Sequence, residues 1–390
     1  MAKLKDIGVI ITGNTPKTSD PKNYETTDIP FIKPSDISDN AISYLHNSEF
    51  YISEYAREKS RIVPVDSILF TCIGIIGKIA VNKVECAFNQ QINAIIPDKS
   101  KCLTDYLVYA LQSKKRLLQE TANAPVVPIL NKTQFSEIEI ELPSLEQQEK
   151  ISVQLNKIND LISQHNLQLS KLDELVKSRF IEMFGDPVIN DKNWIIDTLG
   201  NYMTTLTDFS ANGSYELLDS NVVMYDEPNY AIMVRTTDLE SDDLTSGVKY
   251  IDEAAYKLLD KSKLFGGELI MNKIGSAGKI YIMPHIDQPA SLGRNAFMFR
   301  FDERLNMKYL YFLLLSDYGT NEIQQYVRGA VTKTITKDST RAIKIIVPPI
   351  DLQNQFATFV EQTDKSKLAV QQSLEKLETL KKSLMQQYFG

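Results

Sequence analysis

The sequence predicts an α+β protein in which two mixed α/β domains alternate with two long helices, which pair as an antiparallel coiled coil with pseudo-twofold symmetry. Two observations predict this architecture. A long segment occurs twice, at residues 142–185 and 347–390, and the copies align without a gap at an offset of 205. The residues that precede each copy share short motifs in the same order. Because two copies are too few for a solenoid, the repeat indicates a molecule with two related halves.

The repeated segment carries apolar residues that alternate by four and three over about five heptads, which is the spacing of a coiled-coil seam. One helix cannot bury such a seam alone, so we expect the two copies to pack on each other. The residues expected at this helix-pair interface are Ile151, Leu155, Ile158, Ile162, Leu169, Leu172, Phe356, Val360, Val370, Leu374, Leu377 and Leu384.

Polar residues interrupt both seams. His165 and Arg179 stand at seam positions of the first copy, and Lys367 and Lys381 stand in the second. Such residues cost stability but fix the register of a helix pair. Because Lys367 and Lys381 replace apolar residues of the first copy, the symmetry of the pair is not expected to be strict.

The predicted boundaries follow from the repeat and from helix-ending residues. We expect a first domain over residues 1–141, a first helical segment over 142–186, a second domain over 187–346 and a second helical segment over 347–390. Within the first segment, a helix from Leu145 to Phe184 is expected to end before Gly185, and Pro187 prevents its continuation.

The two domains carry the same motifs in order. Residues 31–37 (FIKPSDI) parallel 233–239 (MVRTTDL), and Ile-Gly-x-x-Gly-Lys-Ile occurs at 73–79 and again at 274–280. Residues 124–132 correspond to 329–338. Glycines inside strand-like runs favour a kinked β-hairpin at both Gly-Lys motifs. A helix is expected from Thr104, with an apolar face of Tyr106, Leu107, Ala110, Leu111 and Leu117.

Composition sets limits on location and chemistry. The net charge of −7 argues against a non-specific polyanion binder, although a local basic face remains compatible with it. The N-terminus lacks the pattern of a signal peptide, and no apolar run approaches the roughly 20 residues of a membrane span, so a cytoplasmic protein is expected. Cys72, Cys86 and Cys102 have no CxxC spacing and are expected to be buried or reduced thiols.

Catalytic and metal-binding signatures are missing from the sequence. His46, His165 and His285 are far apart, without metal-ligand spacing, and there is no HExxH, GxSxG or Walker A motif. The two Gly-Lys motifs lack the GK[ST] ending of a phosphate-binding loop. We therefore expect no catalysis, no metal and no cofactor in this chain alone.

Basic and amide residues recur near the turns of both domains. Arg and Lys pair with guanine O6 and N7, Asn and Gln pair with adenine N6 and N7, and the same cations bind phosphates. As a set repeated in corresponding places, these residues favour a bipartite DNA reader. The expected DNA-binding residues are Lys17, Lys33, Lys78, Asn89, Gln90, Gln91, Arg235, Lys273, Lys279, Arg294, Asn295 and Lys333.

These motifs in this arrangement resemble the specificity subunit of Type I restriction–modification systems. The resemblance rests on the Leu-Pro-x-Leu-Glu-x-Gln element at 142–148, on LDELVKSRFIEMFGDP at 172–187, and on VPPIDLQ and LETLKKS in the second copy. The domain openings DIG and TLG and the two Gly-Lys hairpins match the target recognition domains of that family.

The resemblance implies a non-catalytic, DNA-binding subunit. Each target recognition domain would read one half of a split double-stranded DNA site, and the helices would set the gap between the halves. It further implies two modification (methyltransferase) subunits, which bind S-adenosylmethionine and methylate adenine, and restriction subunits, which use ATP. Two alternatives remain open from the residues alone: a coiled-coil scaffold that binds only protein, and an enzyme that uses the Gly-Lys hairpins for phosphate chemistry.

Overall fold

The computed structural model describes residues 1–39, 41–121 and 128–390. The chain forms two compact units, which we call unit 1 (residues 1–167 and 371–390) and unit 2 (residues 168–370). Each unit therefore joins one mixed α/β domain to segments of both long helices. Within the described residues, no helix is both long enough and apolar enough to cross a membrane.

Unit 1 contains a five-stranded sheet in the order β2-β10-β7-β8-β4 and a smaller sheet in the order β5-β3-β9-β6. The larger sheet is formed by β2 (Gly8–Thr12), β4 (Ser43–Leu45), β7 (Ile68–Thr71), β8 (Ile79–Asn82) and β10 (Ile92–Pro97). The smaller is formed by β3 (Ile29–Ile32), β5 (Tyr51–Ile52), β6 (Ile62–Val63) and β9 (Cys86–Phe88). The remaining elements are β1 (Ala2–Lys3), α1 (Leu4–Ile7), α2 (Thr104–Thr121), α3 (Lys132–Ser136) and β11 (Glu139–Ile140).

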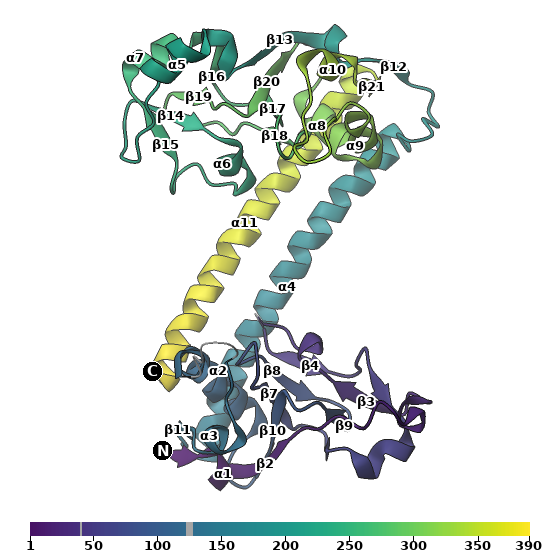
Figure 1. Cartoon of the computed structure of the whole chain (residues 1–390), viewed down its shortest axis with the longest axis vertical. Helices are drawn as coiled ribbons and strands as arrows, with labels where there is room; N and C mark the ends of the chain where they lie inside the picture. The colour runs from purple at the N-terminus through teal and green to yellow at the C-terminus, as the bar shows by residue number, and fades with distance from the viewer. Residues whose placement is uncertain (40, 122–127) are drawn as a thin grey trace. The chain divides into compact units, whose positions relative to one another are not determined.

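Unit 2 repeats this plan with two four-stranded sheets, β13-β20-β17-β18 and β15-β14-β19-β16 (Figure 1). Their strands are β13 (Met203–Asp208), β14 (Ala231–Val234), β15 (Lys249–Ile251), β16 (Lys263–Leu264), β17 (Leu269–Asn272), β18 (Ile280–Ile282), β19 (Ala290–Leu292) and β20 (Ala296–Phe301). The strand β12 (Ile195–Thr198) pairs with β21 (Lys344–Val347). The helices are α5 (Tyr215–Asn221), α6 (Thr236–Glu240), α7 (Glu253–Leu258), α8 (Met307–Leu315), α9 (Asp317–Gln324) and α10 (Lys337–Ala342).

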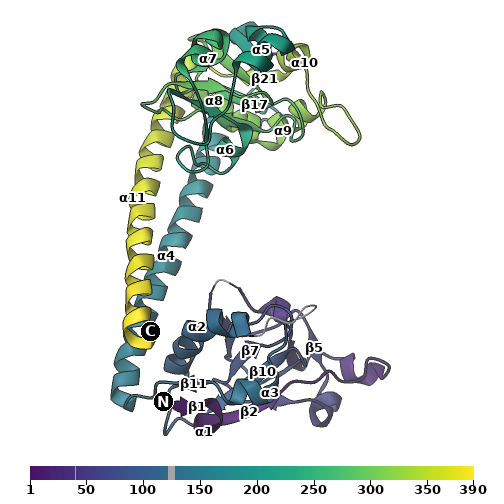
Figure 2. The ribbon, with the colours of Figure 1, turned by 60° about the vertical axis from the view of Figure 1, so that its left-hand side comes forward.

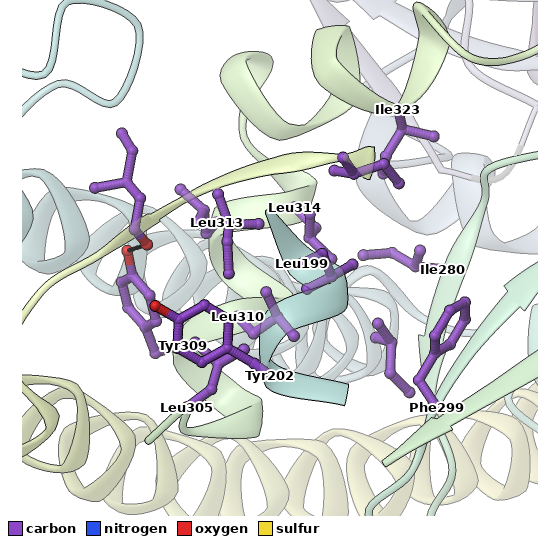
Figure 3. Packing of buried hydrophobic residues seen from close by; sticks show 14 of the residues in the cluster. Leu199, Tyr202, Ile280, Phe299, Leu305, Tyr309, Leu310, Leu313, Leu314 and Ile323 are labelled. Carbon is purple, nitrogen blue, oxygen red and sulfur yellow. Dashed lines mark hydrogen bonds between the residues drawn. The ribbon is translucent and has the colours of Figure 1, made fainter. Parts of the chain in front are cut away.

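In each unit a helix packs on one sheet, which is β2-β10-β7-β8-β4 in unit 1 and β13-β20-β17-β18 in unit 2, and forms the main core with it. In unit 1, α2 buries Tyr106, Tyr109 and Leu118 against the sheet. The expectation that Leu117 faces this core was wrong, because Leu117 is exposed and Leu118 is buried. At about 100° per residue, residue 118 lies within about 20° of Leu111, whereas residue 117 points elsewhere. Figure 3 shows the equivalent core of unit 2, where side chains of α8 gather with Leu199, Ile280 and Phe299 of neighbouring elements.

The long helices α4 (Leu145–Phe184) and α11 (Ile350–Phe389) run antiparallel within each unit. In unit 1, Tyr388 Oη donates to Gln154 Oε1 at 2.7 Å, and His165 Nε2 lies 3.0 Å from Ser373 Oγ. Figure 2 shows the C-terminal turns of α11 beside α4. The predicted mixed α/β fold with two paired long helices is confirmed, and so is the end of α4, where Gly185 has a φ of +80°.

Unit 2 holds the other part of the same antiparallel pair. The Phe180 and Phe356 rings lie 5.4 Å apart across the two helices, and Lys367 forms an ion pair with Asp173. Among the predicted interface residues, Leu155, Ile158, Phe356, Val360 and Val370 are buried and the others are half-buried. The seam lysines differ: Lys367 has its carboxylate partner on the other helix, whereas burial lowers the pKa of Lys381.

A buried glutamine fixes the first turn of each long helix to its domain. The Gln148 side chain accepts from Leu103 N at 2.9 Å and donates to the carbonyls of Lys101 (3.0 Å) and Pro143 (2.9 Å). Gln353 repeats this arrangement in unit 2, where it accepts from Asn306 N at 2.8 Å and donates to the carbonyls of Arg304 and Pro348. The two glutamines recur in the repeat because each satisfies backbone groups of the loop that precedes α2 or α8.

Candidate nucleic-acid interface

The sheet β5-β3-β9-β6 of unit 1 and the sheet β15-β14-β19-β16 of unit 2 each contain one parallel strand pair, β3 with β9 and β14 with β19. Neighbouring parallel strands end at the same edge, so the loops that follow them lie side by side. Asn89 N–H donates to the Ile32 carbonyl at 3.1 Å, and Gly293 N–H donates to the equivalent Val234 carbonyl at 2.8 Å. We call this the reading edge of each unit.

The reading edge gathers many of the residues that the sequence singled out. In unit 1 it places Lys33, after β3, beside the turn that holds Asn89, Gln90 and Gln91. In unit 2 it places Arg235, after β14, beside Arg294 and Asn295. The first residue of each loop is held in the same way: Lys33 N–H donates to Asp36 Oδ2 at 2.7 Å, and Arg235 N–H donates to Asp238 Oδ2 at 2.8 Å.

The predicted glycine-kinked hairpins are present, and their lysines reach toward the reading edge. The strand pairs β7–β8 and β17–β18 are antiparallel, and Gly74 and Gly275 at their turns have φ of +77° and +80°. Lys78 Nζ donates to the Pro34 carbonyl, in the loop after β3, at 3.1 Å. Lys279 forms an ion pair with Glu240 of α6, which follows β14. This hairpin geometry differs from the strand–loop–helix of a phosphate-binding loop.

A further segment closes each hairpin turn. Gly74 N–H donates to the Pro128 carbonyl at 3.1 Å, and Gly275 N–H donates to the Lys333 carbonyl at 2.9 Å. The isolated bridges Ile73–Ile129 and Ile274–Thr334 repeat the same contact. The predicted correspondence of residues 124–132 with 329–338 therefore holds over residues 128–130, while residues 124–127 lie outside the described part of the chain.

The reading edge of unit 2 contains a cavity of about 340 Å³. Its walls include the apolar side chains of Phe209, Met224 and Met233, together with the threonines Thr236 and Thr237. Arg235, Arg294 and Asn295 complete the polar part of the lining. A cavity with an apolar floor and a few convergent polar groups suits a flat, polar-edged ligand such as a nucleobase.

Both arginines of this cavity are held by carboxylates. Arg235 donates to Asp238 at 2.6 Å and to the Gly247 carbonyl at 2.8 Å, and its hydrogen bonds to Asp238 raise the pKa of its guanidinium. Arg294 donates to Asp219 at 3.1 Å, and its guanidinium lies 5.2 Å from the centre of the Phe209 ring. A guanidinium that is already neutralised and oriented is suited to neutral acceptors such as guanine O6 and N7.

Unit 1 carries neutral and cationic groups of a different kind at its edge. Lys33 Nζ lies 3.0 Å from the centre of the Phe50 ring, and the exposed Gln90 accepts from Thr15 Oγ1 at 2.7 Å. The nearly buried Asn89 donates to Gln91 Oε1 at 2.9 Å. Lys17 is exposed in the loop that follows β2. Amide groups of this kind can pair with adenine edges.

Two predicted residues of unit 2 have distinct surroundings. Lys273 is only 15% exposed and binds Asp208 at 2.7 Å, and Asp208 also binds Lys337 at 2.7 Å. Burial raises the pKa of the Asp208 carboxyl, but hydrogen bonds from the two lysines outweigh burial and hold this pKa below its ordinary value. Lys333 is exposed, and only its backbone carbonyl joins the hairpin turn. A DNA contact by any of these residues stays a prediction.

Sequence reasoning missed Asp208, Phe209, Thr236 and Thr237, which the fold brings to the reading edge of unit 2. Thr236 and Thr237 directly follow Arg235, so the alignment with the Lys33 loop contained a signal for them. Asp208 carries no such signal, because the equivalent strand position in unit 1 is Thr12: Asp208 pairs with Phe297 in β20 and Thr12 pairs with Asn93 in β10.

The described residues also bear on the expectations for metal ions and cysteines. No group of three or more His, Cys, Asp or Glu residues there is placed to hold a metal ion. The expectation for the cysteines is confirmed as to burial, because Cys72, Cys86 and Cys102 are buried and form no disulfide. Burial raises the pKa of each of these thiols to about 12, so they are poor nucleophiles at neutral pH.

Comparison with known proteins points to one family. The sequence pattern of the family described as "Type I restriction modification DNA specificity domain" matches residues 1–173 and 200–380. The chain is 27% identical over 382 residues to the Type I restriction enzyme MjaIX specificity subunit of Methanocaldococcus jannaschii, covering 92% of this chain and 85% of that protein. It is 25% identical over 302 residues to the MjaVIII specificity subunit of the same organism, covering 74% and 70%.

A solved structure shares the fold. The Type I restriction–modification S subunit from M. genitalium aligns with a TM-score of 0.60 at 12% sequence identity, covering 100% of this chain and 95% of that one. At this identity the likeness concerns the fold alone.

Proposed function

The chain belongs to the family of Type I restriction–modification DNA specificity domains, and we propose that it acts as the specificity subunit that selects a split DNA site, with one domain for each half-site. It carries no catalytic group of its own. Modification subunits that bind S-adenosylmethionine supply adenine methylation, and restriction subunits that use ATP complete the cleaving complex.

The observation that supports this proposal most directly is the repeated reading edge. The same strand ends, the same hairpin turn and the same closing segment converge in both units, yet the side chains differ: Lys33, Asn89 and Gln90 in one, Arg235, Arg294 and Asn295 in the other. Loops on a rigid frame are where binding residues concentrate. Two domains that bind two different half-sites would need the same backbone arrangement with different side chains on it.

The long helices supply the constant part of the proposed mechanism. The glutamines Gln148 and Gln353 fasten α4 and α11 to the two domains, and each unit contains an antiparallel part of the helix pair. A helix pair of fixed length would hold two readers at a fixed spacing on DNA, where one turn measures about 34–36 Å. Its exposed faces would dock the modification subunits.

Exchange of one domain tests the proposal. Residues 1–140 are replaced by the same region of a related specificity subunit, and the chain is produced with its modification subunits in a host that lacks other methyltransferases. Modified-base sequencing of the host DNA should show a change in one half of the methylated site and no change in the other half. A change in both halves, or in neither, would contradict one-domain, one-half-site reading.

A further inference from the structure

Unit 1 contains a groove of about 600 Å³ beside its reading edge, and none of the residues predicted to bind DNA lines it. Thr12 of β2 lies on one wall, Ser60 and Arg61 precede β6 on another, and Lys132 stands at the first turn of α3. The groove is continuous with the reading edge through Asn14, whose Oδ1 accepts from Arg61 N at 2.7 Å and whose backbone N–H donates to the Phe88 carbonyl at 3.0 Å.

The charges in the groove are not balanced within the chain. Arg57 binds Glu54, and also binds Glu85 at 2.9 Å, so its charge is neutralised. Across the described residues, no carboxylate lies within 4.0 Å of a charged nitrogen of Arg61 or Lys132. Residues 40 and 122–127, which the structure does not describe, include no acidic residue. Two exposed cations therefore remain in a concave site of an otherwise acidic protein.

One residue that lines the groove has a hydroxyl group without a partner. The Ser60 Oγ atom is buried and makes no hydrogen bond within the described chain. A buried hydroxyl without a partner is costly, and such groups usually have one. Rotation of the Ser60 side chain toward the groove would let this hydroxyl donate to an oxygen acceptor held between Arg61 and Lys132.

The corresponding place in unit 2 shows which group binds the lysine that is equivalent to Lys132. Lys337 is the counterpart of Lys132 at the repeat offset, and Asp208 is the counterpart of Thr12 by strand register. In unit 2 the Asp208 carboxylate binds Lys337 at 2.7 Å. In unit 1 the carboxylate is replaced by a threonine hydroxyl, so the lysine has no anion from its own chain.

We propose that this groove holds a phosphodiester of the DNA backbone, which Arg61 and Lys132 bind as cations and the Ser60 hydroxyl binds as a hydrogen-bond donor. The inference rests on the proposed DNA-reading function and adds to it a phosphate clamp in the first domain. Its role is positional: it fixes the register of the duplex next to Gln90 and carries no sequence information. Unit 2 supplies its own carboxylate at this place and has no such clamp there.

Salt dependence of DNA binding tests the clamp. The full chain, assembled with its modification subunits, is titrated with a duplex that carries the methylated site found by sequencing, and with a scrambled duplex, over a series of KCl concentrations. Arg61→Gln and Lys132→Gln should each reduce the slope of log K against log[KCl] by roughly 0.9, the value for one lost phosphate contact. The fold loss of affinity should be the same on both duplexes.

Two controls locate the effect. Lys99→Gln removes one positive charge beyond the opposite end of β10 and should leave the slope of log K against log[KCl] unchanged. Arg61→Lys keeps the charge and should have the wild-type slope. Methylphosphonates, introduced singly through the half-site read by the first domain, should weaken the wild-type complex at one position where they no longer weaken the Arg61→Gln complex.

Unchanged slopes, or a loss confined to the specific duplex, would overturn the clamp while leaving the proposed function in place. Failure of the wild-type complex to prefer the specific duplex would instead contradict the proposed function itself. Thermal unfolding of each variant shows whether its fold is kept, and Ser60→Ala, which should lower affinity without changing the slope, gives a measurement that does not depend on charge.

Discussion

The two mixed domains share a backbone plan but differ in how particular cations near their reading edges are neutralised. In unit 2, Arg235, Arg294, Lys273 and Lys337 all bind carboxylates of their own domain. In unit 1, Lys33 lies against the Phe50 ring, and Arg61 and Lys132 have no carboxylate partner in the described chain. A neutralised cation is better suited to base edges, whereas an unpaired one attracts phosphate. If both edges bind DNA as proposed, we expect affinity and selectivity to be divided unequally between the domains.

The contacts that are the same in both units are those that join each long helix to its domain. Gln148 and Gln353 make the same three kinds of hydrogen bond, and Tyr106 and Tyr309 both donate to backbone carbonyls of the segments that precede the long helices, at 2.9 Å and 2.8 Å. These residues lie far from the reading edges. Variation in the loops is therefore tolerated without loss of the architecture that presents them.

The largest expected loss of stability tests whether Gln148 and Gln353 are equivalent anchors of the long helices. Gln148→Leu and Gln353→Leu should each destabilise their own unit by about 4 kcal/mol, because each leaves one backbone N–H and two carbonyls buried without partners. Hydrogen exchange of α2 and α8 measures the two units separately. Gln164→Leu and Gln355→Leu, exposed on the same helices, are matched controls. Markedly unequal losses would show that the two anchors are not equivalent.

Asp208→Asn should destabilise unit 2 by about 3 kcal/mol at neutral pH, because it leaves two lysines close together without their carboxylate. Because the folded-state pKa of Asp208 lies below its ordinary value of 3.8, its contribution is present above pH 3.8 and is lost as the pH falls through the folded-state pKa. The difference between wild type and variant in chemical unfolding should therefore shrink below that pH.

The counterpart in unit 1 serves as the control for this charge effect. Thr12→Val removes one hydrogen bond, from Thr12 Oγ1 to Asn93 Oδ1 at 2.6 Å, and should cost about 1 kcal/mol. Neither side chain carries a charge, so this cost should not change across the acidic range. A pH-dependent effect of Thr12→Val, or a pH-independent one of Asp208→Asn, would contradict the contrast between the domains.

Base reading by the neutralised arginine should appear as lost selectivity. Arg294→Ala should cost about 2 kcal/mol of discrimination at one base pair of one half-site, with little change in the salt slope. Gln90→Ala should do the same in the other half-site. Binding of the assembled complex to duplexes with single base-pair changes measures both. A uniform loss on all sequences would assign Arg294 to phosphate instead.

The smallest effect concerns the helix pair. Lys381→Met should stabilise unit 1 by about 1 kcal/mol, because burial lowers the pKa of this seam lysine and its charge is a cost at neutral pH. That cost should vanish as the pH rises from the lowered pKa toward 10.5, so the gain should shrink in alkaline solution. Lys367→Met removes the ion pair with Asp173 and is the contrasting variant, for which no gain in denaturant unfolding is expected.

Much of the fold follows from patterns that are local in sequence. The heptad spacing identified the helix α4, because a long amphipathic helix repeats one physical requirement many times, and Gly185 and Pro187 identified its end. The Ile-Gly-x-x-Gly-Lys-Ile motif identified both hairpins, because φ near +80° at Gly74 and Gly275 favours glycine. The face of α2 was misassigned at Leu117, where a one-residue shift decides which leucine points inward.

The sequence by itself determined the two-part architecture, the two long helices and the Gly-Lys hairpins, since those features come from spacing along one chain. Only the tertiary structure decided which cations are free. Asp208 lies 65 positions before Lys273 and 129 before Lys337 along the chain, and no local pattern joins them. Charge neutralisation depends on separations of a few ångströms between side chains, and these are set by strand pairing rather than by sequence neighbourhood.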